Sequence, residues 1–502
     1  MKKEELFETL QDLDDELIRE AEGHVVKKSK SRKLYAYASI AAVFMLALIA
    51  GVIFREKKPV TSGTSSVPES MLAETEARHY IYPERLVSIN PSYPVSAIKD
   101  MDAQTFTASD QYWKWFSDYR EKAEASSGLQ AQMMPYCQAL IGNVLAESGE
   151  NVVCSPLNTY IAFSMLAELT DGNTRRQLLN MLGAEDIETL RRNVSSLWNS
   201  NYADTPVLKS LLANSVWIDQ AAGFNEKTLS RLAETYYASS VSGDMSSSEM
   251  LEALKAWIND NTGGLLKDYV DSMQLDPETI LMLASTIYYK AAWRNCFYTD
   301  ETKEEIFHGE KGDKTVQMMH SHDSQGVYYG EKYTAVRLSL QDSGFMYFFL
   351  PDEGTDVSEL ASDPEVYEML TRKTDMDEAI KQEECWAFPI VNLSVPKFSV
   401  SGSSDLKKAL VAMGATDVLE AGKADFSPLT AAEGMFLSSA DHTAMVEIDE
   451  NGVTAAAYTA MALAGGMLPE EIIDLVFDRP FMFVITGFDG SLLFSGIVRN
   501  ID

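Results

Sequence analysis

The chain has 502 residues, enough for several domains, and 46% of them are hydrophobic, which supports a large core. Its formal net charge of −33 argues against a nucleic-acid partner, because an acidic surface is repelled by the phosphate backbone. The four cysteines are widely spaced and lack the CxxC or Cys/His spacing of a metal site, so neither a disulfide scaffold nor a metal or other cofactor is predicted.

The N-terminal part of the sequence predicts a membrane anchor. Residues 1–33 contain an amphipathic stretch, either a solvated helix or a docking helix for a cytoplasmic partner. Residues 34–54 carry no charge, and this length matches an α-helix that spans a hydrocarbon core. Basic residues in 27–33 outnumber those in 55–58, so the positive-inside rule places the N terminus in the cytoplasm. We therefore expect a single-pass, bacterial-type cell-membrane protein with an extracellular domain.

A flexible linker is predicted over residues 55–111. Much of this segment is rich in Ser, Thr, Pro and Glu and has weak periodicity, which is typical of a tether. Aromatic residues return in Tyr112–Tyr119, so the folded domain is predicted over 112–502.

Helical and strand patterns are mixed in the rest of the chain. Helices are predicted over 138–146, 158–169 and 251–267. Strands are predicted over 280–289, 336–340, 346–350, 391–397 and 481–486. Because strands and helices do not alternate regularly, the pattern indicates an α+β domain.

The most informative segment runs from Glu450 to Leu468. It opens with an acid and a glycine, continues with small residues and contains neither Lys nor Arg. In an extended strand, alternate side chains share a face, so the small or modest, uncharged residues Val453, Ala455, Ala457 and Thr459 would lie together. Such a strand could enter a packed sheet late without steric conflict. A small-residue helix or a plain linker is the alternative.

This segment resembles the reactive-loop hinge of the serpins, and the other segments that resemble serpin motifs occur in the expected order. The resemblance covers roughly residues 112–502. The other segments are Asn151–Asn158, Asp171–Thr174, Trp257–Gly263, Leu283–Trp293, then Thr302 with Phe307, Val316 and Met318–Met319, and finally Val395–Phe398 and Asp478–Phe483 with Phe494–Val498.

The resemblance implies a serpin fold with three β-sheets, eight or nine helices and an exposed reactive loop. It also implies that the chain is not an enzyme but a monomeric suicide inhibitor whose partner is a serine protease. The protease would form an acyl-enzyme with the loop, which would then insert into the central sheet and trap it. Consistent with this, the sequence lacks catalytic motifs such as GxSxG and HExxH.

The resemblance assigns the hinge and two candidate cleavage sites. The usual spacing from the hinge glycine gives the bond Gly466–Met467, whereas Met467–Leu468 offers the protease a side chain for its primary pocket. Neither contains a basic residue, so elastase-, subtilisin- or chymotrypsin-like proteases are expected rather than trypsin-like ones. A non-inhibitory serpin that acts as a surface binding or structural module is the alternative. The hinge residues are Glu450, Gly452, Val453, Thr454, Ala455, Ala456, Ala457 and Thr459.

Five further residues are assigned by the resemblance to the regions that control opening of the central sheet: Ser155, Asn158, Ser285, His442 and Trp293. Family members usually carry serine at the position of Asn158 and asparagine at that of Ser285, and here the two are exchanged. Because a buried cluster needs matched donors and acceptors, we expect Asn158, Ser285 and His442 to lie together beneath the sheet, with Ser155 nearby. Alternatively, Asn158 only begins a helix and Ser285 is an ordinary strand residue.

Overall fold

The computed structural model describes residues 86–93, 98–99, 101–146, 148–263, 266–295, 297–371, 386–453 and 471–501, all within the compact unit Leu72–Asp502. The predicted anchor at 34–54 and the segment 1–33 lie outside the described residues. Within the described ranges, we find no helix whose length and apolar character would let it cross a membrane.

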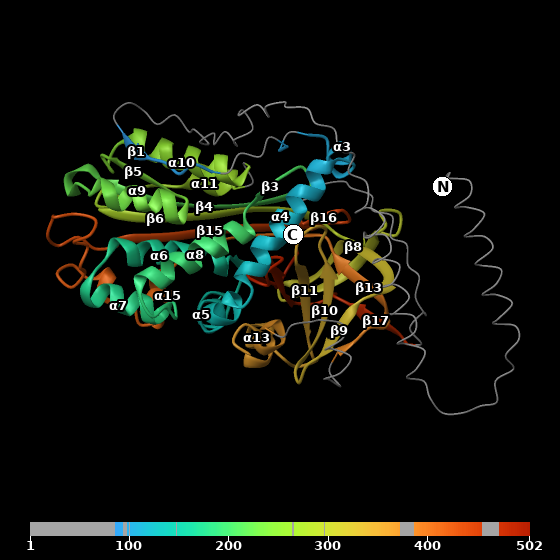
Figure 1. The fold of residues 1–502 in the computed structure, drawn as a ribbon. Helices are drawn as coiled ribbons and strands as arrows, with labels where there is room; N and C mark the ends of the chain where they lie inside the picture. The colour runs from blue at the N-terminus through green and yellow to red at the C-terminus, as the bar shows by residue number, and fades with distance from the viewer. Residues whose placement is uncertain are drawn as a thin grey trace, which may run out of the picture. The chain divides into compact units, whose positions relative to one another are not determined.

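The largest sheet has the strand order β1–β5–β4–β6–β16–β15–β14, with the short strand β3 beside β4 (Figure 1). Its central strands β4 and β6 are almost completely buried, because helices pack on both faces. The strands are β1 (Val87–Ile89), β3 (Ala203–Asp204), β4 (Leu208–Asp219), β5 (Ala238–Gly243), β6 (Leu281–Ala292), β14 (Phe398–Asp405), β15 (Ser439–Asp449) and β16 (Gly452–Val453).

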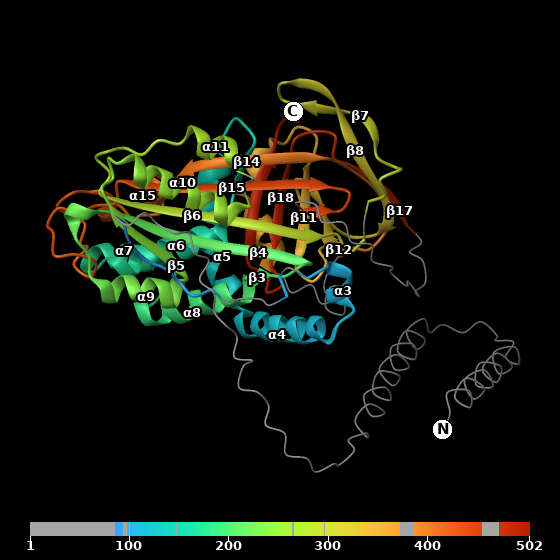
Figure 2. The same cartoon turned by 90° about the horizontal axis from the view of Figure 1, so that it is seen from above.

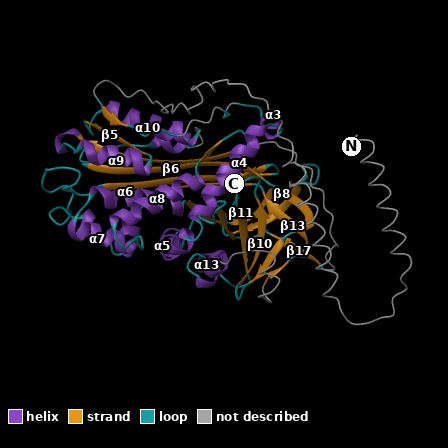
Figure 3. Cartoon of the chain, in the orientation of Figure 1, coloured by secondary structure: helices purple, strands orange, loops and turns teal. Residues whose placement is uncertain are grey.

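Two smaller sheets complete the β-structure. One has the order β12–β9–β10–β11–β18–β19–β2 and the other β17–β13–β8–β7. Figures 2 and 3 show these strands beside one end of the largest sheet, with most helices gathered around the other end. Their bounds are β2 (Val152–Cys154), β7 (Lys303–Gly309), β8 (Gly312–Ser324), β9 (Gly326–Tyr329), β10 (Tyr333–Ser339), β11 (Phe345–Pro351), β12 (Trp386–Ala387), β13 (Ile390–Pro396), β17 (Ile472–Val476), β18 (Phe481–Thr486) and β19 (Leu492–Val498).

The helices α6 and α10 cover opposite faces of the largest sheet (Figure 1). Helix α6 is buried along its whole length, and apolar residues occur on all of its faces. The helices are α3 (Ala103–Thr107), α4 (Asp110–Ser126), α5 (Leu129–Leu145), α6 (Pro156–Leu169), α7 (Gly172–Met181), α8 (Ile187–Asn201), α9 (Glu226–Tyr236), α10 (Ser248–Thr262), α11 (Lys267–Ser272), α12 (Val357–Leu360), α13 (Pro364–Thr371) and α15 (Lys407–Ala412), with 3-10 turns η1 (Gln220–Ala222) and η2 (Asp417–Leu419).

The predicted helices and strands are present, but several boundaries differ, and the helix predicted over 138–146 begins nine residues earlier, at Leu129. The helix predicted over 251–267 ends at Thr262, because Gly263 takes a left-handed conformation (φ 61°) and caps it. The described residues alone also form more than the expected eight or nine helices, partly because α3 and α4 precede the rest.

The stretch predicted as a flexible linker contains ordered elements. β1 pairs antiparallel with β5, from Val87 opposite Ser242 to Ile89 opposite Ser240. Helices α3 and α4 follow, and Phe106 is buried in a small cluster with neighbours from α4 and from the approach to β4. These segments lack strong periodicity because the rest of the domain supplies the surface on which they pack, so ordered structure begins well before residue 112.

Candidate functional site

The predicted hinge begins inside the largest sheet. Gly452 and Val453 form β16, which lies between β6 and β15 and pairs antiparallel with both. At the other end of the same two strands, β6 and β15 pair directly and in parallel. The sheet is therefore closed at one end and parted by the start of the hinge at the other. The direct pairs run from Ser439 opposite Met282 to Thr443 opposite Thr286.

The close approach of the strands explains why a glycine starts β16. A Cβ atom on Gly452 would lie 2.2 Å from the carbonyl oxygen of Ala291, a distance at which the backbone would have to move. The next residue, Val453, is 1% exposed and packs into the main hydrophobic core. Gly452 and Val453 therefore fit between β6 and β15 without steric conflict.

Three contacts fix the turn that precedes β16. Glu450 is buried, and its carboxylate receives the Lys397 ammonium at 2.7 Å and the Thr302 hydroxyl at 2.8 Å. Burial alone would raise the pKa of Glu450, but these partners outweigh it and hold the pKa below its ordinary value. Trp293 donates its indole N–H to the carbonyl of Asp449 at 2.8 Å. Sequence reasoning missed the pairing of Glu450 with Lys397.

A polar cluster lies where β6 and β15 pair directly. Asn158 on α6 donates its amide to the Ser285 hydroxyl (2.7 Å) and to the backbone carbonyl of Thr286 (2.6 Å). The backbone N–H of Ser155 donates to Nε2 of His442 (2.8 Å), and the Ser155 hydroxyl accepts from the N–H of Asn158 (3.3 Å). The structure thus brings these four predicted side chains together beneath the closed part of the sheet. Trp293 lies apart from them, beside the hinge.

Asn214 on β4 belongs to the same cluster and was missed from the sequence. Its amide donates to Oδ1 of Asn158 at 2.9 Å, so Asn158 is bonded to two neighbouring strands. Asn214 sits in the apolar run of β4, where a single buried asparagine indicates a specific hydrogen-bond partner. This isolated asparagine was the feature of the sequence from which its place in the cluster could have been predicted.

Burial lowers the pKa of His442 to about 4, so the ring is neutral at neutral pH, as its acceptor role requires. Below the ordinary histidine pKa of about 6.5, the unfolded chain binds a proton that the folded chain does not. The contribution of the neutral His442 ring to the free energy of unfolding is therefore fully present above that pH and is lost as the pH drops towards 4. We expect a loss of about 2 kcal/mol between pH 6.5 and 5. Urea unfolding at several pH values should show this slope, and it should be reduced in His442→Asn. Equal slopes in the two proteins would contradict the assignment.

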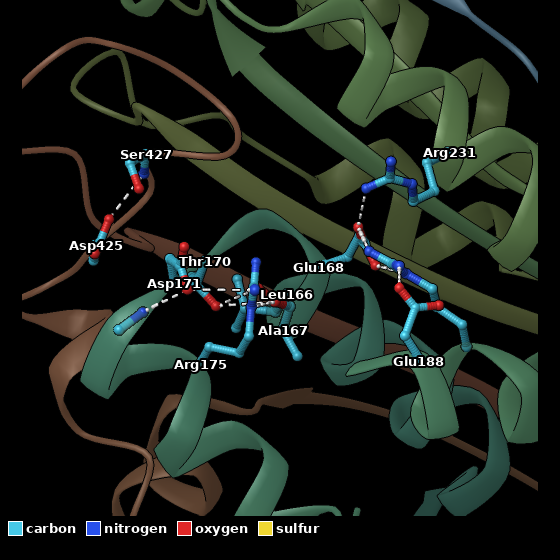
Figure 4. Close-up of polar contacts among 12 residues, drawn as sticks. Leu166, Ala167, Glu168, Thr170, Asp171, Arg175, Glu188, Arg231, Asp425 and Ser427 are labelled. Carbon is cyan, nitrogen blue, oxygen red and sulfur yellow. Dashed lines mark hydrogen bonds and ion pairs between the residues drawn. The ribbon is translucent and has the colours of Figure 1, made fainter. Parts of the chain in front are cut away.

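The helix that carries Asn158 is anchored at its other end by a buried carboxylate (Figure 4). Glu168 on α6 is 1% exposed, accepts two bonds from Arg191 on α8 (2.6 and 2.7 Å) and pairs with Arg231 on α9 at 2.9 Å. Burial alone would raise the pKa of Glu168, but the two guanidinium groups hold it below its ordinary value. This network fixes α6, and with it the polar cluster, relative to α8 and α9.

Several predicted residues lie outside the described ranges. They comprise the hinge beyond Val453 and both candidate cleavage sites, namely Thr454, Ala455, Ala456, Ala457, Thr459, Gly466, Met467 and Leu468. Within the described part of the chain, no group of three or more His, Cys, Asp or Glu residues is arranged to hold a metal ion. Cys137 and Cys154 are buried free thiols, and burial raises the pKa of Cys137 to about 12.

The profile of the family described as serpin (serine protease inhibitor) matches residues 132–501. The chain belongs to the serpin family. Many members of this family are protease inhibitors, and this serpin is not an enzyme. The three sheets and the ordered sequence motifs of this serpin agree with that assignment.

The alignments with known relatives cover most of the folded domain. The leukocyte elastase inhibitor of Sus scrofa is 30% identical over 363 residues, which are 69% of this serpin and 92% of that protein. The native state of tengpin, a thermophilic serpin, has a TM-score of 0.65 and 22% identity and covers 82% of this chain and 98% of its own. The native stressed conformation of Arabidopsis AtSerpin1 has a TM-score of 0.61 and 26% identity, with 76% and 98% covered.

Proposed function

We propose that this serpin inhibits elastase-, subtilisin- or chymotrypsin-like serine proteases by trapping the acyl-enzyme. The protease serine would attack the carbonyl carbon of the scissile bond, the amine side would leave, and an ester would join the protease to the loop. The loop from Val453 to residue 466 would then extend β16 between β6 and β15. About 14 residues at about 3.3 Å each would carry the tethered protease roughly 45 Å.

The observation that carries the proposal is the position of β16. The start of the hinge already lies between β6 and β15, and the residues that follow are uncharged and mostly small. Farther along, β6 and β15 pair directly, so an inserting loop would have to part these two strands. Two relatives support the proposal, because one is named an elastase inhibitor and another adopts a native stressed conformation.

Incubation with candidate proteases tests the proposal directly. We expect a complex that survives boiling in detergent, because the ester is covalent. Cleavage without such a complex, or no reaction with any of the three protease classes, would favour a non-inhibitory serpin that acts as a surface binding or structural module.

The specificity is expected to follow the absence of basic residues in the loop. Elastase-, chymotrypsin- or subtilisin-like proteases should form the complex, and trypsin should not, because its primary pocket requires Lys or Arg. Mass spectrometry of the released C-terminal fragment should give a chain that begins at Met467 or Leu468. A fragment that begins elsewhere in the loop would overturn the proposed cleavage sites.

We also propose that the protein is held in a bacterial-type cell membrane by residues 34–54, with 1–33 in the cytoplasm and the serpin domain outside. The support is the uncharged run and the excess of basic residues before it. Protease added to intact cells should remove the serpin domain and leave residues 1–33 protected. Recovery of a mature chain without the apolar run would show a cleaved signal peptide instead.

A further inference from the structure

A small hollow of about 130 Å³ lies where β10 and the start of β9 meet the chain that follows β6. Among the described residues, Arg337 on β10 is the one charged side chain that lines it. A cavity of about 150 Å³ holds a molecule of benzene, so this hollow has room for an ion of roughly five heavy atoms. The polar side chains that line it can all donate hydrogen bonds, and they are those of Asn295, Ser324, Gln325 and Ser339.

The guanidinium of Arg337 has no counter-ion among the described residues. It lies over the rings of Phe345 and Trp386, at 4.5 and 5.3 Å from their centroids, and its buried Nη1 atom finds no acceptor in the described part of the chain. Burial raises the pKa of Tyr347, which lies opposite Arg337 on β11, so this hydroxyl stays neutral and supplies no negative charge. A half-buried cation of this kind is unusual in a chain of net charge −33, because buried charges are normally paired.

Gly326 keeps the space beside this guanidinium open. It lies opposite Arg337 on β9, and a Cβ atom there would stand 3.5 Å from Nε of Arg337 and 3.2 Å from the ring of Trp386. Asp323 is close in sequence but does not line the hollow, and its carboxylate accepts the amide of Asn295 and a backbone N–H. The hollow is therefore lined by one cation and by neutral donors.

We propose that this hollow binds a small tetrahedral oxyanion, sulfate or phosphate, with Arg337 as its counter-ion and the surrounding hydroxyls and amides as further donors. The site is separate from the reactive loop and does not rest on protease inhibition. Asn295 follows by two residues Trp293, which bonds to the turn before the hinge. A bound ion would therefore stabilise the native protein at the end of the largest sheet where the hinge starts.

Calorimetric titration of the full chain in detergent, with sodium sulfate and separately with sodium phosphate, tests the proposal. Sodium chloride keeps the ionic strength constant, and calorimetry separates binding from the general stabilisation that sulfate causes by its exclusion from protein surfaces. We expect saturable binding of one oxyanion per chain, and the probe that binds more tightly identifies the preferred ion.

Arg337→Met should weaken binding by about tenfold or more, because methionine can still pack against the two rings but carries no charge. Arg120→Met is the matched control, because Arg120 also lies over a ring, that of Phe488 at 5.8 Å, and does not line the hollow. The control should change the affinity less than about twofold. Thermal unfolding of each variant without the ion checks that the domain remains folded.

A second pair of variants leaves Arg337 in place. Ser339 lies two residues farther along β10, so its side chain is on the same face. Ser339→Asp puts a carboxylate in the position of the ion, so it should abolish binding and raise the unfolding temperature of the ion-free protein. Ser339→Asn has a similar size without the charge and should bind within about threefold of the unchanged protein. No saturable binding, equal effects of Arg337→Met and Arg120→Met, or equal effects of Ser339→Asp and Ser339→Asn would overturn the proposal.

Discussion

Ala455→Arg is expected to convert this serpin from an inhibitor into a substrate. A strand that continues from β16 places residue 455 on the same face as Val453, which packs into the main core. An unpaired charge buried there costs several kcal/mol. If about 3 kcal/mol of this cost appears in the insertion barrier, insertion slows on the order of 100-fold, and the ester is hydrolysed first. Gel assays should show cleaved serpin and little stable complex.

Ala456→Arg provides the control for this change. It introduces the same side chain at the neighbouring position, on the alternate face, where the sequence already places Tyr458. The control should keep more of the stable complex than Ala455→Arg. If Ala455→Arg still trapped protease with unchanged stoichiometry, loop insertion would be the wrong mechanism for this chain.

Asn158→Ala is expected to release the closed part of the sheet. The change removes the donor for Ser285 and for the Thr286 carbonyl, and the acceptor for Asn214. Leaving buried partners unpaired costs about 1–3 kcal/mol. Because these bonds act where β6 pairs directly with β15, the loss should favour spontaneous loop insertion or polymers over simple unfolding. The half-life of inhibitory activity on mild heating should fall, and native gels should show polymers.

Asn143→Ala is the matched control for this second prediction. Asn143 is also a helical asparagine, but its amide donates to Ala139 in its own helix. It should leave the half-life almost unchanged. An Asn158→Ala protein that only unfolds, without polymers or an inserted form, would contradict a role in keeping the sheet closed.

The core elements could be predicted from the sequence because their patterns are local. Helix α6 is mostly apolar and begins after Ser155 with Pro156 in its first turn, so the helix and its start could be predicted from residues that are neighbours in the sequence. The same holds for β6, which reads as a long apolar run because it is covered on both faces. The resemblance to the serpin family then predicted how these elements are arranged in the fold.

The remaining features depend on contacts between distant segments. Asn214 meets Asn158 across 56 positions of sequence, and Glu450 meets Lys397 through the turn before β16. Tyr112 donates to Asp342 at 2.7 Å across 230 positions, which helps to fix α4. No periodicity within a single segment encodes such pairs, so they emerge only when the fold places the partners side by side.

The pairing of β1 with β5 bears on how the protein behaves at high local concentration. A bare edge strand is a template on which a second molecule can add its own strand, and proteins cover such edges to avoid aggregation. Here Val87–Ile89 occupies part of the outer edge of β5, with Leu86 buried beside it. If neighbouring copies are tethered to one membrane, their crowding favours association. The same stretch of chain that leads towards the proposed anchor would then also reduce edge-to-edge self-association among those copies.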